Sequence, residues 1–401
     1  MTLHIDVAKT IEKVGKMRRR NLIIGGAAAV AAIGVGAYLK LKPKPVELGF
    51  VPNPEFVAKA RALIAANPMV DTHAHPGKTF IRDNENTSLP LVLRLVAGNR
   101  TSEDKSVVDM NAAGMSAVAF AGVADFNVIG FKKGGGLVTA REFKQGEAIA
   151  SYRRQIDNLR DAMHANNVEI ALTPADVRAA TAQHKVKAIL TMEGADFLEG
   201  KLERLKEIYD DGVRSVTIVH YRASEVGDIQ TQAPVRGGLT GFGVEAVKEM
   251  QRLGLIIDLA HASEPTAFKA LENVSVPVML SHTHLNGGPA GDFPRFVTNE
   301  LAQAVVKAGG IIGAWPTGVG ITTLGGFVDR ILELANRVGI DGIAIGTDMD
   351  ANYKPVLTKY IDLVLVVSEL LRRGMSEIDV AKFMGGNFLR VFDKVVAAAA
   401  K

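Results

Sequence analysis

Residues 244–261 read VEAVKEMQRLGLIIDLAH, an amphipathic helical pattern over Val244–Leu253 followed by an apolar run over Gly254–His261. A helix that leads through glycine into a short apolar strand is typical of the repeating unit of a parallel α/β fold. The run ends in His261, although nothing in such a fold requires an ionisable side chain there. This stretch therefore indicates a fold class and a candidate functional position together.

The same alternation continues in both directions from this unit. We predict eight main strands over Pro68–His73, Ser116–Val123, Val186–Glu193, Val213–His220, Gly254–His261, Pro277–His282, Gly310–Trp315 and Gly342–Asp348. Helical patterns such as Glu300–Ala308 separate them. The longer connection after the second strand contains a Gly-rich loop at 134–136, a polar helix around Arg141–Asn166 and an accessory strand at Glu169. Eight strands in about 280 residues is the size of a (β/α)8 TIM barrel, which is the predicted α/β fold.

The composition excludes several classes of protein. Of the 401 residues, 47% are hydrophobic and 22% are charged, which rules out disorder throughout the chain. Because there is no Cys, any bound metal must use His and carboxylate ligands. The net charge of +4 comes from the first 48 residues, which hold nine basic and three acidic residues, whereas the rest of the chain carries 38 basic and 40 acidic ones. No nucleic-acid surface is indicated.

The stretch Leu22–Leu39, LIIGGAAAVAAIGVGAYL, has no charged residue and about the length that crosses a bilayer as a helix. We predict a single transmembrane anchor or uncleaved signal at 22–39, between a basic cytoplasmic tail at 1–21 and a linker at 40–54. The barrel at 55–401 would then be periplasmic or extracellular. A cleaved signal peptide, with a twin-arginine pattern at Arg19–Arg20, and a buried helix are the alternatives.

Ionisable side chains recur at the C-terminal ends of the predicted strands. The first strand ends in VDTHAHP, where His73 and His75 point to the same face because side chains alternate along a strand. Further strands end in Glu193, His261, His282 and Asp348. Since the C-terminal ends of barrel strands meet at one rim, these six side chains form a candidate metal centre.

Six ligands suffice for two metal ions. A carboxylate can bridge two ions and an imidazole cannot, so Glu193 is the predicted bridge, with a bridging hydroxide between the ions. The predicted sets are His73, His75 and Asp348 for one ion, and His261 and His282 for the other. Imidazole and carboxylate ligands without thiolate favour two Zn2+ ions, with Mn2+, Co2+ or Fe2+ as alternatives. Asp71 and Asp258 are predicted either to orient the imidazoles from behind or to be ordinary strand-end residues.

These residues resemble the membrane dipeptidase (renal dipeptidase) family of amidohydrolase-type, metal-dependent hydrolases. The resemblance rests on VDTHAHP at 70–76, TMEGAD at 191–196, GVRSVTIVHYRASEVGD at 212–228, GLTGFGVEAVKEMQRLGLIIDLAHAS at 238–263, PVMLSH at 277–282, FPRFVTNE at 293–300 and GIAIGTDMD at 342–350. These segments span nearly all of the barrel in the family's order. The resemblance implies a zinc dipeptidase, a metallopeptidase that hydrolyses dipeptides, including those with a D or unsaturated C-terminal residue.

The resemblance also implies roles that spacing alone does not give. His220 is similar to a histidine that contacts the substrate carbonyl and stabilises the tetrahedral intermediate, Arg295 to an arginine near the substrate, and Asp348 to a ligand that also shuttles a proton. The family usually has H-x-D at the end of the first strand, so His75 keeps a ligand but removes a negative charge, which would make the metal more electrophilic. His284 adds an imidazole after the sixth strand and is predicted to line the pocket or to support a ligand rather than to bind the metal itself.

Two other functions stay open. An amidohydrolase-type enzyme acting on cyclic amides, lactones or phosphoesters would share the metal centre and the H-x-H pattern. In the commonest binuclear form of such enzymes, however, a carbamylated lysine at the end of the fourth strand bridges the metal ions, and this chain has no lysine there. A binding or scaffold protein on an inactive barrel would not need six ligands. The expected partners are a small peptide substrate and, through the N-terminal helix, a membrane; a homodimer is left open.

Overall fold

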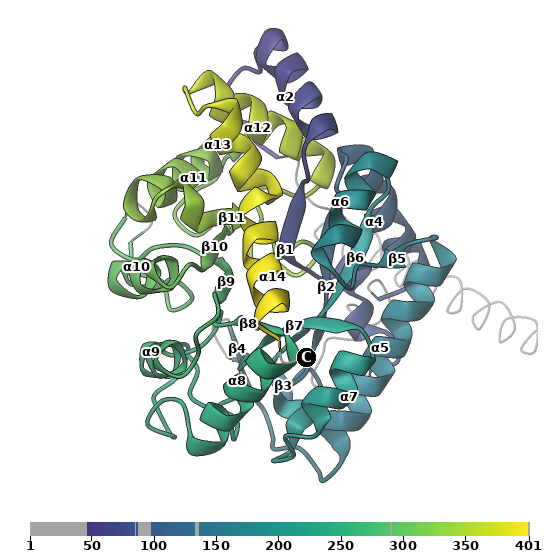
Figure 1. The fold of residues 1–401 in the computed structure, drawn as a ribbon, viewed down its shortest axis with the longest axis vertical. Helices are drawn as coiled ribbons and strands as arrows, with labels where there is room; N and C mark the ends of the chain where they lie inside the picture. Colours follow the sequence, from purple (N-terminus) through teal and green to yellow (C-terminus); the bar gives the residue numbers. More distant parts are fainter. Residues whose placement is uncertain (1–45, 85, 87–97, 133–135, 289–290, 400–401) are drawn as a thin grey trace, which may run out of the picture. The chain divides into compact units, whose positions relative to one another are not determined.

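The computed structural model describes residues 46–84, 86, 98–132, 136–288 and 291–399. Eight parallel strands close into a barrel in the order β1–β2–β6–β7–β8–β9–β10–β11, and Asp71 of β1 lies opposite Ile345 of β11 (Figure 1). The strands are β1 (Val70–Ala74), β2 (Ala117–Val123), β6 (Lys187–Glu193), β7 (Val213–Thr217), β8 (Ile256–Asp258), β9 (Met279–Thr283), β10 (Ile311–Ala314) and β11 (Ile343–Ile345). The predicted barrel and its eight strands are confirmed.

Helices surround the strands, and several of them begin at a side-chain cap. They are α2 (Pro54–Ala66), α4 (Arg100–Ala113), α5 (Glu147–Ala165), α6 (Pro174–Gln183), α7 (Arg204–Asp210), α8 (Gly241–Leu253), α9 (Glu264–Glu272), α10 (Asn299–Lys307), α11 (Leu324–Val338), α12 (Leu363–Arg372), α13 (Glu377–Ala381) and α14 (Asn387–Ala398). At α8, the side chain of Thr240 accepts a hydrogen bond from the Gly243 amide, and Gly254 ends the helix with a φ of 80°. Glycine adopts this left-handed conformation without a steric penalty, so the chain can turn directly into β8.

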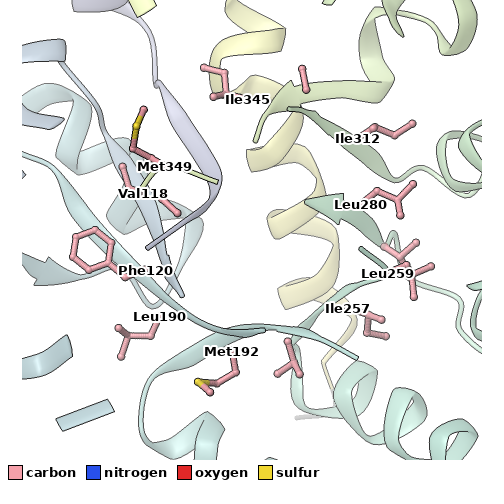
Figure 2. Close-up of a cluster of buried hydrophobic side chains, with 14 of the residues drawn as sticks. Val118, Phe120, Leu190, Met192, Ile257, Leu259, Leu280, Ile312, Ile345 and Met349 are labelled. Carbon is pink, nitrogen blue, oxygen red and sulfur yellow. The ribbon is translucent and has the colours of Figure 1, made fainter. Parts of the chain in front are cut away.

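Side chains alternate along the strands between the helices and the interior of the barrel. In β6, Leu190 and Met192 belong to the large hydrophobic cluster between the strands and the surrounding helices. Ile189 belongs to a separate, smaller cluster with residues of other strands and of α14. Figure 2 shows members of the large cluster, including Phe120 and Leu259, pointing outward from the strands. Because side chains alternate with a period of two, Glu193 shares the inner face with Ile189.

One end of the barrel is closed by α14. Phe388, Leu389, Phe392 and Val395 of this helix pack in one cluster with residues at the N-terminal ends of the strands, among them Val70, Ala117, Ile256, Met279 and Ile311. In Figure 1, α14 (yellow) lies across the strands. The N-terminal end is therefore filled with apolar side chains, and only the C-terminal end remains for polar chemistry.

The connection between β2 and β6 contains more secondary structure than the sequence indicates. The predicted polar helix is α5, and the accessory strand is β5 (Glu169–Ile170), which pairs with the first two residues of β6. An antiparallel hairpin, β3 (Ile129–Phe131) and β4 (Leu137–Thr139), flanks the Gly-rich segment and was not predicted. Strands of three residues are too short to show an alternating pattern, which explains the omission.

The compact unit begins at Val46, within the stretch predicted as linker. Val46, Leu48 and Phe50 pack on the hydrophobic core, and the carbonyls of Glu47 and Leu48 accept hydrogen bonds from the first turn of α11. The predicted tail at 1–21, the anchor at 22–39 and the start of the linker lie outside the described residues. Within the described part of the chain, we find no helix that combines the length and apolarity of a membrane span.

Candidate metal centre

The predicted ligands and His220 lie at the C-terminal end of the barrel, and none is more than 8% exposed. Three of these residues lie within strands: His73 in β1, Glu193 at the end of β6 and His282 in β9. The others follow a strand. His75 comes directly after β1, and three residues lie three positions beyond their strand: His220 after β7, His261 after β8 and Asp348 after β11. His261 and Asp348 have φ angles of 66° and 52°, so turns with left-handed backbone carry them back over the barrel.

The carboxylate of Glu193 is the centre of the cluster. The Nε2 atoms of five histidines surround it: His261 (2.9 Å), His73 (3.4 Å) and His282 (3.6 Å) face Oε1, whereas His220 (3.3 Å) and His75 (3.4 Å) face Oε2. Each oxygen therefore faces its own set of imidazoles. A carboxylate that bridges two metal ions divides its oxygens between them in this way. The division differs from the predicted ligand sets in one respect, because His73 faces the same oxygen as His261 and His282.

Three groups have ligand atoms close enough to share an ion: His73, His75 and Asp348; His73, Glu193 and His282; and Glu193, His220 and His261. The first is the set predicted for one ion. The Nε2 atoms of His261 and His282, predicted to share the other ion, are 3.2 Å apart. The third group includes His220, which the resemblance assigned to the substrate, so the structure places His220 beside the predicted ligands.

Hydrogen bonds at the rear nitrogens orient several of these rings. Nδ1 of His75 lies 3.1 Å from the carbonyl of Ala121, and Nδ1 of His282 lies 2.9 Å from Oγ of Ser281. A proton donated from Nδ1 leaves the Nε2 lone pair directed at the centre of the cluster, which is the form that binds metal.

The two aspartates predicted behind the imidazoles have different roles. The Asp258 carboxylate accepts hydrogen bonds from the Ser281 hydroxyl at 2.6 Å and from the Thr217 hydroxyl at 2.6 Å, so it reaches His282 through Ser281. Asp71 accepts bonds from the Tyr360 hydroxyl and from the backbone of His73, and no hydrogen bond joins it to an imidazole of the described residues. Asp71 therefore joins elements of the fold instead of orienting a ring.

Burial and neighbouring charges shift the pKa values in the cluster. Burial lowers the pKa of His261 and His282 well below their ordinary value, which keeps both imidazoles neutral. Although burial opposes ionisation, neighbouring histidines, led by His220, hold the pKa of Glu193 well below its usual range. Burial raises the pKa of Asp348 to about 7 against the opposing effect of His73. Although burial opposes protonation, Glu193 raises the pKa of His73 to about 9. His261 and His282 are thus in the neutral state that metal binding requires, whereas His73 must release a proton to bind a metal ion.

Arg295 reaches the cluster from the loop after β9. It is 3% exposed; its Nη2 lies 2.9 Å from Nε2 of His282, and its Nη1 donates to the Gln230 side chain. Its guanidinium also lies 5.5 Å from the centre of the Trp315 ring. The structure thus brings the predicted substrate-binding arginine to the predicted metal ligands.

Asp125 was missed by the sequence analysis. It lies two residues beyond β2, is 0% exposed, and its Oδ1 lies 2.6 Å from Nδ1 of His220. The second strand ends in GVAD, so the rule that found the other residues, an ionisable side chain just beyond an apolar strand, also identifies this one.

The sequence predicts that His284 points the same way as His282, but its contacts lie on the side of α11. Its Nε2 lies 3.3 Å from Oε2 of Glu333 on α11, and its ring packs edge-on against Phe296. Its Nδ1 is buried without a hydrogen-bond partner. Burial and the nearby Arg330 lower the pKa of His284 to about 3.

Because its pKa in the folded state lies below the unfolded value of about 6.5, neutral His284 contributes stability above pH 6.5 that is lost as the pH falls toward 3. Between pH 7.5 and 5, the wild type is expected to lose about 2 kcal/mol more unfolding free energy than His284→Gln, which does not titrate. Urea unfolding of both proteins at the two pH values measures the difference. Parallel pH dependences would contradict this account of His284.

The chain also resembles known proteins in sequence and fold. A family model described as membrane dipeptidase (peptidase family M19) matches residues 57–401. Dipeptidase verJ of Clonostachys rogersoniana is 26% identical over 64% of this chain and 68% of its own length. Dipeptidase tcpJ of Claviceps purpurea is 30% identical over 62% of this chain and 60% of its own length. The alignments to such curated relatives thus span between about half and two thirds of the relatives' length.

Solved structures share the fold. The probable dipeptidase PvdM from Pseudomonas aeruginosa superposes with a TM-score of 0.68 at 20% identity, covering 86% of this chain and 100% of that one. A metallopeptidase from Rhodobacter sphaeroides, liganded with a phosphinate mimic of the dipeptide L-Ala-D-Ala, gives a TM-score of 0.67 at 17% identity, covering 82% of this chain and 99% of that one.

Proposed function

The chain belongs to the membrane dipeptidase family, peptidase family M19, and on that basis we propose that it is a zinc-dependent dipeptidase with a binuclear centre. One observation carries the proposal: side chains from six different strand ends meet at the Glu193 carboxylate, at the end of the barrel that α14 does not fill. The family indicates the class of reaction, and the cluster of imidazole and carboxylate ligands indicates metal ions as the cofactor.

The residues present fit divalent metal ions. The Nε2 atoms of His73 and His75 are 3.1 Å apart, and those of His261 and His282 are 3.2 Å apart. In each pair one Nε2 can donate a proton to the other, and a metal ion that displaces this proton would be held by both nitrogens. We assign His73, His75, Glu193 and Asp348 to one ion and Glu193, His261 and His282 to the other. When bound, such ions supply an activated water and polarise the scissile carbonyl.

The chain's own residues bind and orient the dipeptide and move the proton. His220 would donate a hydrogen bond from Nε2 to the oxygen of the scissile carbonyl as negative charge develops there. Asp125 and Glu193 raise the pKa of His220 against the effect of burial, which favours the form that carries a proton on both nitrogens. Asp348 is buried beside the proposed ions, and its carboxylate is placed to pass a proton to the leaving amine.

Arg295 would bind the carboxylate of the C-terminal residue of the dipeptide. A buried guanidinium next to the reaction centre forms strong, directional hydrogen bonds to a carboxylate. The phosphinate bound to the Rhodobacter sphaeroides enzyme mimics a dipeptide that ends in a D residue. This supports the inclusion of L,D-dipeptides among the proposed substrates.

The proposal is tested by measuring amino acid release from L,L- and L,D-dipeptides and from matching dipeptide amides by the zinc-loaded full-length chain. We expect turnover of free dipeptides, loss of turnover with a chelator and recovery on adding zinc, and poor turnover of the amides. Two bound metals without turnover of any dipeptide would contradict the proposal and favour the alternative suggested by His75, an amidohydrolase-type enzyme acting on cyclic amides, lactones or phosphoesters.

We also propose that residues 22–39 anchor the barrel on the periplasmic or extracellular side of a membrane. The uncharged stretch and its basic N-terminal flank support this. Fractionation of cells that express the full-length chain tests it. Recovery of the uncleaved chain without membranes would contradict it.

A further inference from the structure

Asp125 is a fully buried carboxylate whose two oxygens serve consecutive residues beyond β7. Its Oδ1 lies 2.6 Å from Nδ1 of His220, and its Oδ2 accepts a hydrogen bond from the backbone N–H of Tyr221 at 2.9 Å. Burying a carboxylate is costly unless its oxygens are hydrogen-bonded. Here both carboxylate oxygens are hydrogen-bonded, and one of them contacts His220, the residue proposed to bind the reacting carbonyl.

The backbone around Asp125 is tied to the metal-binding strand. The N–H of Ala124 donates to the carbonyl of Glu193 at 2.8 Å, and the N–H groups of Val128 and Ile129 donate to the carbonyl of Asp125 at 3.0 and 3.2 Å. The position of the Asp125 carboxylate is thus fixed relative to Glu193, and so is the position of the ring that it binds.

We infer that Asp125 is a positioning residue that holds the His220 ring with Nε2 directed at the reaction centre. In the structure this Nε2 lies 3.3 Å from Oε2 of Glu193. The inference rests on the proposed function, because it concerns the group assigned to the developing oxyanion. Asp125 lies behind His220, and no hydrogen bond in the described residues joins it to a predicted metal ligand, so it acts on the reaction through His220.

Asparagine at position 125 separates this role from simple packing. The amide has nearly the same volume but offers one acceptor and one donor where the carboxylate offers two acceptors. The Nδ1–H of His220 and the N–H of Tyr221 both require an acceptor, so one of the two hydrogen bonds is lost. Because the Tyr221 N–H belongs to the backbone and cannot reorient, it keeps the amide oxygen, and the amide NH2 faces Nδ1 of His220, which can accept it only without its own proton.

The first test is a double-mutant cycle in the full-length chain. Asp125→Asn is expected to lower kcat by about 10- to 100-fold with little change in KM and with unchanged metal content. In a His220→Ala background the same substitution should change kcat by less than about twofold, because the group it positions is gone. A full further loss in that background would overturn the inference.

Asp176→Asn provides the matched control. The Asp176 carboxylate also accepts two backbone N–H groups, those of Leu172 and Thr173, but at the start of α6 and without contact to the candidate site. We expect this variant to keep the wild-type kcat. A comparable loss in both variants would show that the Asp125 effect reports general damage to the fold.

The second test is independent of the reaction. In 1H–15N correlation spectra of the imidazoles, with the His220 signals assigned from their absence in His220→Ala, the wild type should show a proton on Nδ1 of His220, and Asp125→Asn should lose or shift it. Nδ1 of His220 without a proton in the wild type, or unchanged in Asp125→Asn, would overturn the inference. If no dipeptide is hydrolysed, the proposed function fails, and these spectra still decide whether Asp125 positions His220.

Discussion

Replacing Glu193 by glutamine is expected to reduce the metal content from two ions per chain to less than one and to lower kcat by more than about 1000-fold. The physical reason is the position of the two carboxylate oxygens. Oε1 lies 2.9 Å from Nε2 of His261, and Oε2 lies 3.4 Å from Nε2 of His75. An amide keeps one oxygen and turns an N–H toward the other set, so one ion loses a ligand, the other keeps only a neutral amide oxygen, and the negative charge between the ions disappears.

The measurement is metal content by elemental analysis together with kcat on the best dipeptide. Glu369→Gln is the matched control, because the Glu369 side chain is 2% exposed and pairs with Arg372 and Arg373 at the C-terminal end of the outer helix α12. The control should keep both ions and its activity. If Glu193→Gln kept two ions per chain, Glu193 would not be the bridge and the ligand assignment would need to change.

Replacing His220 by alanine is expected to lower kcat by about 100- to 1000-fold while leaving two ions per chain. The lost group is the proposed donor to the oxyanion, and such a donor acts mainly in the transition state, so KM should change little. This substitution also decides between two readings of the geometry, because His220 forms a group with Glu193 and His261 whose ligand atoms could share an ion.

Elemental analysis of the purified variant separates these readings. His164→Ala serves as a control for loss of an imidazole, since His164 lies in the last turn of α5 and outside the candidate site. Two ions per chain with a low kcat would agree with a substrate-contact role. Loss of one ion would make His220 a ligand and would require another donor for the oxyanion.

Much of the site could be predicted because a period of two is a strong signal in buried strands. Apolar runs that end in an ionisable residue marked Glu193 at the end of β6 and His73 in β1, and alternation placed them on the inner face. The resemblance added His220 and Arg295, whose roles follow from no local pattern.

The turns that bring the remaining ligands into the cluster could not be predicted. The apolar run Gly254–His261 suggests a strand up to His261, but β8 ends at Asp258 and His261 adopts a φ of 66°. A left-handed conformation at a residue other than glycine depends on tertiary contacts, which a sequence pattern does not contain. Asp348 is placed in the same way after β11.

The packing of α14 against the N-terminal ends of the strands affects when the barrel can be completed during protein synthesis. The helix is made after all eight strands, and its side chains complete the cluster at their N-terminal ends. The pairing of Asp71 with Ile345 likewise joins the first strand to the last. Until residues 388–395 have been synthesised, the strand ends lack the side chains that cover them in the folded barrel, so a nascent chain exposes apolar surface there. The N-terminal end of the barrel is therefore completed only after its last helix has been made.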